Sequence, residues 1–117
     1  MTWKINQKIT CQSNNFVYMI ICTKESCNQK NKVQQKYIGE TERKLKDRIC
    51  EHIGYIKTNR TEQATGQHFN QKGHQLSDMK VTVLEHVKKS DQEYRKERET
   101  YLISKFNTYY EGMNKKP

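Results

Sequence analysis

The segment KYIGETERKLKDRICEHIGYIK (36–57) decides the fold. Its opening KYIG (36–39) is a short aromatic and β-branched run that closes at a glycine, which predicts a strand. Thr41 is a favourable N-cap, so we expect a helix from there to about residue 57. Four apolar residues recur at helical spacing and predict the buried stripe of that helix: Leu45, Ile49, Ile53 and Ile56.

One flank of this stripe carries polar side chains. At about 100° per residue, Arg48, His52 and Tyr55 align at positions i, i+4 and i+7. Side chains beside a buried stripe are half-sheltered and reach into a cleft that borders the helix. We therefore treat this flank as a candidate functional surface. The simpler alternative is that Arg48 is a solvated helix arginine.

Two further runs predict strands. FVYMIIC (16–22) is β-branched and aromatic, as is typical of a strand buried on both faces. MKVTVLEHV (79–87) alternates between apolar and polar residues and predicts a third strand. Residues 23–35 are polar and form a long loop, so we expect it to close a hairpin with 36–39. Residues 1–15 are also polar and are interpreted as an arm.

The C-terminal part of the chain is predicted to contain two helices. A short one is expected over 61–74, ending near Gly73. Ser90 and Glu93 form a capping box that opens the last helix, which we expect to run to about Asn107. The apolar stripe of that helix contains Leu102, Ile103 and Phe106.

The order strand, strand, helix, short helix, strand, helix predicts an α+β fold. We expect a small three-stranded antiparallel sheet flanked by helices. The 117 residues suffice for one hydrophobic core, so we expect an N-terminal arm (1–15) and one domain (16–117).

Glu99 falls in the middle of the apolar stripe of the last helix, where a carboxylate is unusual because Glu is rarely buried unpaired. One explanation is an i, i+4 ion pair with Arg95 on the same face. The other is an inward carboxylate that holds a metal ion.

The charge of the chain favours a polyanionic partner. Lys and Arg number 22 against 13 acidic residues, giving a net charge of +9 that attracts nucleic acid or an anionic surface. The longest apolar run, 16–22, is too short to span a bilayer, and no signal-peptide pattern opens the chain. We expect an intracellular protein that is neither secreted nor membrane-embedded.

Five motifs in this order resemble the GIY-YIG endonuclease family. They are VYM (17–19), YIG (37–39), Arg48 on the first helix, Glu99 in RKERETYLISKFN, and Asn114 in EGMN. The resemblance spans residues 16–114. The first motif lacks its glycine, and 19 positions separate Tyr18 from Tyr37, more than in the usual short hairpin of the family.

Within the family, the chain is most similar to the endonuclease domain of Penelope-like retroelements. That group has first motifs of the VVY type, cysteines between the tyrosine motifs, and a downstream HF…GH segment. The matching residues here are Cys22, Cys27, His68-Phe69 and Gly73-His74. This resemblance implies DNA as the partner, further domains in a larger retroelement polypeptide, and a nuclear or other intracellular location.

The resemblance also implies a metal-dependent hydrolysis of the DNA backbone. Glu99 would anchor Mg²⁺ or Mn²⁺, and Arg48 would bind a phosphate oxygen. Tyr18 is favoured as general base, with Tyr37 hydrogen-bonded to the water or the phosphate, although the two roles are exchangeable. A phenol acts as a base near neutral pH only if neighbouring cations lower its pKa.

Two more residues complete the catalytic set implied by the resemblance. His52 would orient a tyrosine or contact phosphate, with Tyr55 as an optional neighbour. Asn114 would support Glu99 or the closing turn rather than take part in chemistry. Lysines 44 and 46 and those of the loop would bind the DNA backbone without sequence preference.

A structural Zn²⁺ site is the second expectation. Cys22-x4-Cys27 and His68-x5-His74 have pair spacings close to those of structural Cys₂His₂ sites. The alternative is two unrelated cysteines and two surface histidines. Cys11 is a substitute ligand, Cys50 is interpreted as a free thiol, and His86 has no predicted partner.

Two other functions compete with a retroelement endonuclease. One is a non-catalytic, zinc-stabilised nucleic-acid-binding module. The other is a nuclease that repairs branched or damaged DNA, which would use the same catalytic residues on a substrate of different shape.

Overall fold

The computed structural model describes residues 2–4, 14–24, 27, 34–71, 73–87 and 91–114. Its sheet has the strand order β1-β4-β2-β3. The bounds of the strands are β1 (Thr2–Lys4), β2 (Asn14–Cys22), β3 (Lys36–Lys44) and β4 (Met79–His86).

The predicted three-stranded antiparallel sheet is confirmed as β4-β2-β3. The expected N-terminal arm adds a short fourth strand to it, because β1 pairs in parallel with β4. In this sheet β3 lies at one edge and β1 at the other, so one side of β3 is left open to side chains from both helical layers.

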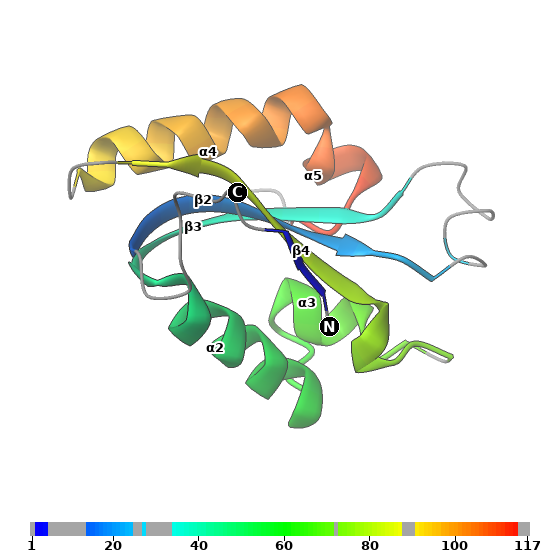
Figure 1. Ribbon diagram of the computed structural model, residues 1–117. Helices are drawn as coiled ribbons and strands as arrows, with labels where there is room; N and C mark the ends of the chain where they lie inside the picture. The colour runs from blue at the N-terminus through cyan, green and yellow to red at the C-terminus, as the bar shows by residue number, and fades with distance from the viewer. Residues whose placement is uncertain are drawn as a thin grey trace.

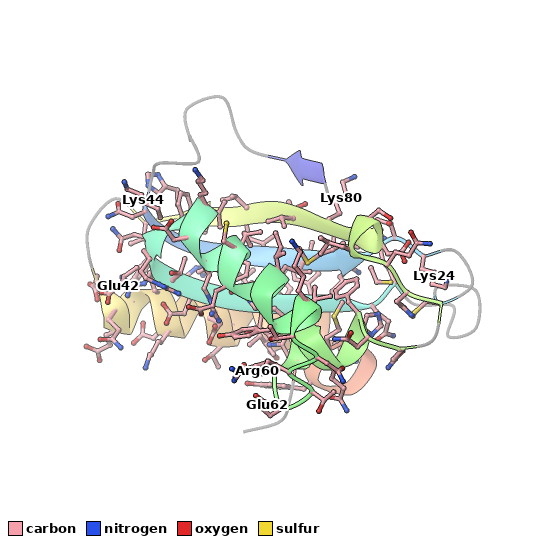
Figure 2. All side chains as sticks on the ribbon, turned by 90° about the horizontal axis from the view of Figure 1, so that it is seen from below. Lys24, Glu42, Lys44, Arg60, Glu62 and Lys80 are labelled. Carbon is pink, nitrogen blue, oxygen red and sulfur yellow. The ribbon has the colours of Figure 1, made fainter. Side chains whose placement is uncertain are left out.

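Helices cover both faces of the sheet. On one side lie α2 (Leu45–Lys57) and α3 (Ala64–His68), and on the other α4 (Gln92–Phe106) and α5 (Thr108–Glu111) (Figure 1). Figure 2 views the molecule from the side of α2, which runs across the sheet towards Arg60 and Glu62. No helix among the described residues is long and apolar enough to cross a membrane.

Strand β2 supplies both halves of the core, as its uninterrupted apolar run predicted. Phe16 and Ile20 pack in the cluster that contains Leu45 of α2, whereas Val17 packs with Leu102 of α4. Because successive strand residues point to opposite faces, one strand holds both helical layers.

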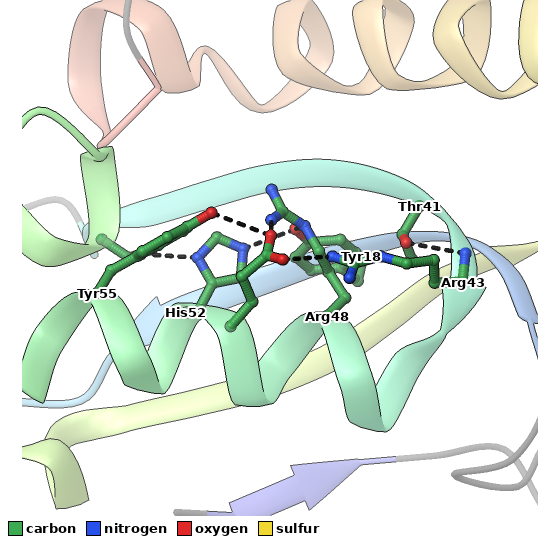
Figure 3. Close-up of polar contacts among 8 residues, drawn as sticks. Tyr18, Thr41, Arg43, Arg48, His52 and Tyr55 are labelled. Carbon is green, nitrogen blue, oxygen red and sulfur yellow. Dashed lines mark hydrogen bonds and ion pairs between the residues drawn. The ribbon is translucent and has the colours of Figure 1, made fainter. Parts of the chain in front are cut away.

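The boundary between β3 and α2 differs from the prediction. The strand continues to Lys44 and the helix begins at Leu45, so Thr41 is not its N-cap. The Thr41 hydroxyl instead accepts a hydrogen bond from the backbone N–H of Arg43 at 3.1 Å (Figure 3). Pairing of Lys44 with Asn14 of β2 keeps this segment extended beyond the point where the capping pattern suggested a helix.

The bounds of α3 and the cap of α4 also differ from the prediction. Helix α3 is limited to five residues within the predicted 61–74 segment, although Gly73 does adopt a positive φ of 84° after it. The side chain of Asp91, not Ser90, caps α4 by accepting from the N–H of Tyr94, and Ser90 lies outside the described residues. Phe106 is 36% exposed, so the buried stripe of α4 is Leu102 with Ile103.

Arg95 fills the inward position near the start of α4. Its side chain is 2% exposed, its Nε donates to Glu40 Oε2 at 2.9 Å, and Nη1 donates to Asn15 Oδ1 at 3.0 Å. The i, i+4 pair with Glu99 was therefore the wrong explanation, since the guanidinium turns to β3 and to the start of β2. This buried pair fixes α4 against the sheet.

Replacing Arg95 with Met should destabilise the fold strongly. The substitution leaves the Glu40 carboxylate without its buried partner, a change that typically costs about 3–5 kcal/mol. Urea unfolding would measure this loss. Arg98→Met is the matched control, because Arg98 of the same helix pairs with Glu85 of β4 in a more exposed ion pair, with side chains 34% and 23% exposed, and its loss should cost less. Equal losses in the two variants would contradict the role given to Arg95.

Candidate active site and metal centre

The polar flank of α2 faces Tyr18 of β2. The Tyr18 phenol is fully buried, and its oxygen accepts a hydrogen bond from Arg48 Nε at 3.0 Å. The same oxygen lies 2.7 Å from His52 Nε2 (Figure 3). The helical spacing of Arg48 and His52 thus brings both side chains to one tyrosine.

Tyr37 joins this group from β3. Its ring centroid lies 5.4 Å from that of His52 and 6.4 Å from that of Tyr18. Tyr18 pairs with Gly39 in the sheet, and a Cβ at Gly39 would lie only 2.5 Å from the Tyr18 oxygen. The glycine of YIG is therefore required for the Tyr18 ring to lie across β3.

A pocket of about 270 Å³ opens at the edge of β3. Both helical layers contribute to its wall, together with the strand itself: Tyr37, Ile38, Glu62, Gln63, Ala64, Glu99, Ile103, Tyr109 and Asn114. Three of the residues singled out in the sequence, Tyr37, Glu99 and Asn114, thus share one pocket. Tyr18, which is fully buried, is not among the lining residues, and neither are Arg48 and His52.

Glu99 is half-buried in this pocket. Burial raises the pKa of its carboxyl group, and the nearby charge of Glu40 raises it further. A hydrogen bond from the backbone N–H of Glu40 and the charge of Arg48 act in the opposite direction. The carboxylate of Glu99 is thus a poorly solvated anion, which a cation in the pocket would stabilise.

Asn114 ties the end of the chain to β3. Its Oδ1 accepts from the N–H of Ile38 at 2.7 Å, and its Nδ2 donates to the carbonyl of Ile38 at 2.8 Å. Both hydrogen bonds of the side chain go to the edge of the sheet beside the pocket. This arrangement supports a structural role for Asn114 at the closing turn.

The tyrosines do not have the lowered pKa that an independent general base requires. Burial raises the pKa of Tyr18 well above its usual range and Tyr37 adds to the rise, while Arg48 only partly opposes it. Burial also raises the pKa of Tyr37 against the effect of Arg48. The cation predicted to lower these values is present, but the loss of solvation outweighs it.

Glu51 was missed by the sequence analysis. Its carboxylate accepts hydrogen bonds from Arg43 Nη2 at 2.7 Å, from the Tyr55 hydroxyl at 3.0 Å, and from Arg48. Burial opposes ionisation, but the bonds from Arg43 and Tyr55 lower the pKa of this group overall. Glu51 therefore holds Arg48 in place beside Tyr18. The i, i+3 spacing of Glu51 from Arg48 was the feature of the sequence that could have predicted this ion pair.

The four predicted zinc ligands lie together on the side of the sheet that α2 and α3 cover. The ligand atoms of Cys22, Cys27, His68 and His74 all lie within 4.8 Å of one another. Both ring nitrogens of His74 are buried without a hydrogen-bond partner. The Cys22 sulfur accepts a backbone N–H from Lys24.

These features fit a metal ion. Two sulfur and two imidazole donors form a common tetrahedral ligand set, and the unpaired nitrogens of His74 would gain a partner. Burial lowers the pKa of His68 to about 4, with a further contribution from His74, so its ring is neutral near pH 7 and able to bind metal.

Cys50 and His86 lie outside this cluster. Cys50 is exposed, as predicted for a free thiol. Cys11 lies outside the described residues. His86 stacks on Phe16 with ring centroids 4.9 Å apart, which gives it a packing role.

Stability should depend on pH through His52. Burial and the charge of Arg48 lower the pKa of its ring from 6.5 to about 3. Between these values the unfolded state binds the additional proton, so the free energy of unfolding should fall as the pH drops through this window. Urea titrations of wild type and His52→Gln at several pH values would measure it, and the variant should have the shallower slope. An equal slope in both proteins would contradict the depressed pKa.

Comparison with known proteins identifies the family. Residues 14–114 match the GIY-YIG catalytic domain, whereas no curated protein and no solved structure matches the chain. The match extends from the first residue of β2 to the asparagine that clamps β3, and it includes the pocket and the tyrosine cluster. The chain therefore belongs to the GIY-YIG family and carries the catalytic domain of a nuclease.

Proposed function

We propose that this protein is a metal-dependent endonuclease that hydrolyses phosphodiester bonds in DNA. The observation that carries the proposal is the pocket at the edge of β3. Glu99 of α4 and Tyr37 of β3 both line this pocket, and the charge of Arg48 acts on both. Cleavage of a phosphodiester needs a cation for the phosphate, a group that handles the proton of water, and stabilisation of the leaving oxygen.

Glu99 is the residue that would hold Mg²⁺ or Mn²⁺. A hard divalent cation prefers carboxylate oxygen and water ligands, and the Glu40 carboxylate nearby increases the negative potential. When bound, the ion would stabilise charge on the phosphate and on the departing 3′ oxygen.

Arg48 would bind a non-bridging phosphate oxygen. Its guanidinium is positioned by Glu51 on one side and by Tyr18 on the other, and its side chain remains 19% exposed. A planar guanidinium held in this way is prepared for the phosphate before DNA binds.

The two tyrosines are proposed to act in series: Tyr37 keeps the contact with water that was expected of it, whereas Tyr18 is no longer assigned as the general base. Tyr37 lines the pocket and is the phenol that a water molecule there would contact. Tyr18 lies between Arg48 and the neutral ring of His52. Tyr37 therefore orients the attacking water, while Tyr18 and His52 form the polar support behind it.

The wider biological setting is also a proposal. Cysteines between the tyrosine motifs and the HF…GH segment are similar to those of Penelope-like retroelements, and the Cys/His cluster shows that these residues come together. We infer that the nuclease domain (16–117), with its arm (1–15), nicks DNA in the nucleus for retroelement integration, as part of a larger polypeptide.

Plasmid cleavage tests the nuclease activity. Incubated with supercoiled plasmid and Mg²⁺ or Mn²⁺, the wild type should produce nicked circles. Glu99→Ala and Arg48→Ala should each lower the rate by about 100-fold or more, because each removes charge stabilisation of the transition state. Fluorescence anisotropy with labelled DNA should show that both variants still bind.

The matched control is Glu97→Ala, which removes an exposed carboxylate of the same helix and should cleave like wild type. Full activity of Glu99→Ala would overturn the metal-anchor assignment. Binding without cleavage by the wild type in either metal would favour the non-catalytic binding module. Strong preference for branched over linear duplexes would favour a repair nuclease.

The Cys/His cluster is proposed to bind one structural Zn²⁺. The four donors come from β2, from Cys27 further along the chain, and from His68 and His74 in and after α3, so the ion would tie these segments together. With only 32% hydrophobic residues, the chain gains stability from such a cross-link.

Elemental analysis of the purified protein should find one equivalent of zinc. Cys27→Ser should lose it and unfold at a lower temperature, because one of the four bonds to the ion is removed. Cys50→Ser is the control, since Cys50 is exposed and distant from the cluster in sequence. Unchanged zinc in Cys27→Ser would refute the ligand set.

A further inference from the structure

Thr65 lies within the predicted helix 61–74, but no motif in the sequence indicated a functional role for it. It is fully buried in α3, and its Oγ1 lies 2.7 Å from Nδ1 of His52. This contact joins two segments 13 residues apart. His52 therefore has a polar partner at each ring nitrogen, Tyr18 at Nε2 and Thr65 at Nδ1.

The direction of each hydrogen bond follows from the chemistry of the donors. A guanidinium has no acceptor, so Arg48 Nε–H donates to the Tyr18 oxygen. The single phenolic proton of Tyr18 is then directed to its other partner, His52 Nε2. Because Nε2 accepts, a neutral His52 carries its proton on Nδ1 and donates it to Thr65 Oγ1.

The opposite tautomer of His52 would interrupt this series of hydrogen bonds. With a proton on Nε2, both His52 and Arg48 would donate to the Tyr18 oxygen, and the buried phenolic proton would lose its acceptor. At the same time, Nδ1 would have to accept from the Thr65 hydroxyl. An unpaired buried donor costs about 1–3 kcal/mol, enough to select one tautomer over the other.

The position of Thr65 is fixed by its neighbours in α3. A Cβ at the adjacent Gly66 would lie only 3.2 Å from the carbonyl oxygen of Tyr55, so the backbone of α3 approaches α2 closely. Asn70 Nδ2 donates to the carbonyls of Ile56 and Gly66 and links the same two helices. Thr65 is thus held at a fixed distance from His52.

We propose that Thr65 is a positioning residue: by accepting the Nδ1 proton of His52, it stabilises the tautomer that the contacts of Tyr18 with Arg48 and His52 select, so that the Nε2 lone pair faces Tyr18. Its importance for cleavage rests on the proposed function, whereas the tautomer itself does not. Thr65→Val keeps the shape of the side chain but removes the acceptor, and Thr65→Ser keeps the hydroxyl.

Nitrogen-15 NMR of the zinc-loaded protein at pH 7, without DNA, tests the tautomer directly. The wild type should show a protonated Nδ1 and an unprotonated Nε2 for His52, with the signals assigned by their loss in His52→Gln. Thr65→Ser should keep this pattern, and Thr65→Val should lose it. A protonated Nε2 in the wild type, or an unchanged pattern in Thr65→Val, would overturn the proposal.

Plasmid nicking adds a second readout. Thr65→Val should lower kcat at least about tenfold with little change in KM, and Thr65→Ser should restore it. Wild-type kcat in a Thr65→Val protein with an altered tautomer would overturn the role in cleavage. If the wild type does not cleave, that result counts against the proposed function, and the NMR pattern alone decides the role of Thr65. Amide dispersion establishes that each variant is folded, and Thr65→Ala replaces Thr65→Val if that variant does not fold.

Discussion

The pairing of Tyr18 with Gly39 across the β2–β3 ladder is the constraint on which the site depends. Because residue 39 has no side chain, the Tyr18 phenol lies over the backbone of β3 and reaches the face of α2. There its oxygen contacts both Arg48 and His52. A register shift of one residue would turn Tyr18 to the opposite face of β2, into the layer of α4, and separate it from both partners.

Much of this arrangement could be predicted because it follows from short-range periodicity. The apolar run of β2 predicted a strand buried on both faces, and helical spacing placed Arg48 and His52 on one flank of α2. The start of α2 was wrong because the capping preference of Thr41 is weaker than the ladder that continues to Lys44. Tertiary contacts decide such boundaries, and a local pattern does not contain them.

The contacts that could not be predicted join segments far apart in the chain. An ion pair of Arg95 with Glu99 in the same helix was one of the two explanations considered, but Arg95 is buried against Glu40 and Asn15. Thr65 gave no signal in the sequence, since a threonine in a polar segment is unremarkable until the fold places it beside His52. The raised pKa values of the tyrosines could not be predicted either. They depend on burial in the assembled core, which outweighs the effect of the neighbouring cation.

Helix α3 links the buried hydrogen bonds of His52 to the Cys/His cluster. It is too short to be stable alone, yet it carries Thr65 against His52 and, one turn later, His68 in the Cys/His cluster. A metal in that cluster would therefore hold the same helix that orients His52. A bound metal would compensate for the small apolar core, and any movement of α3 would be transmitted through Thr65 to the buried hydrogen bonds of His52. Through His68, a metal bound in the cluster would therefore affect the geometry of the proposed active site as well as stability.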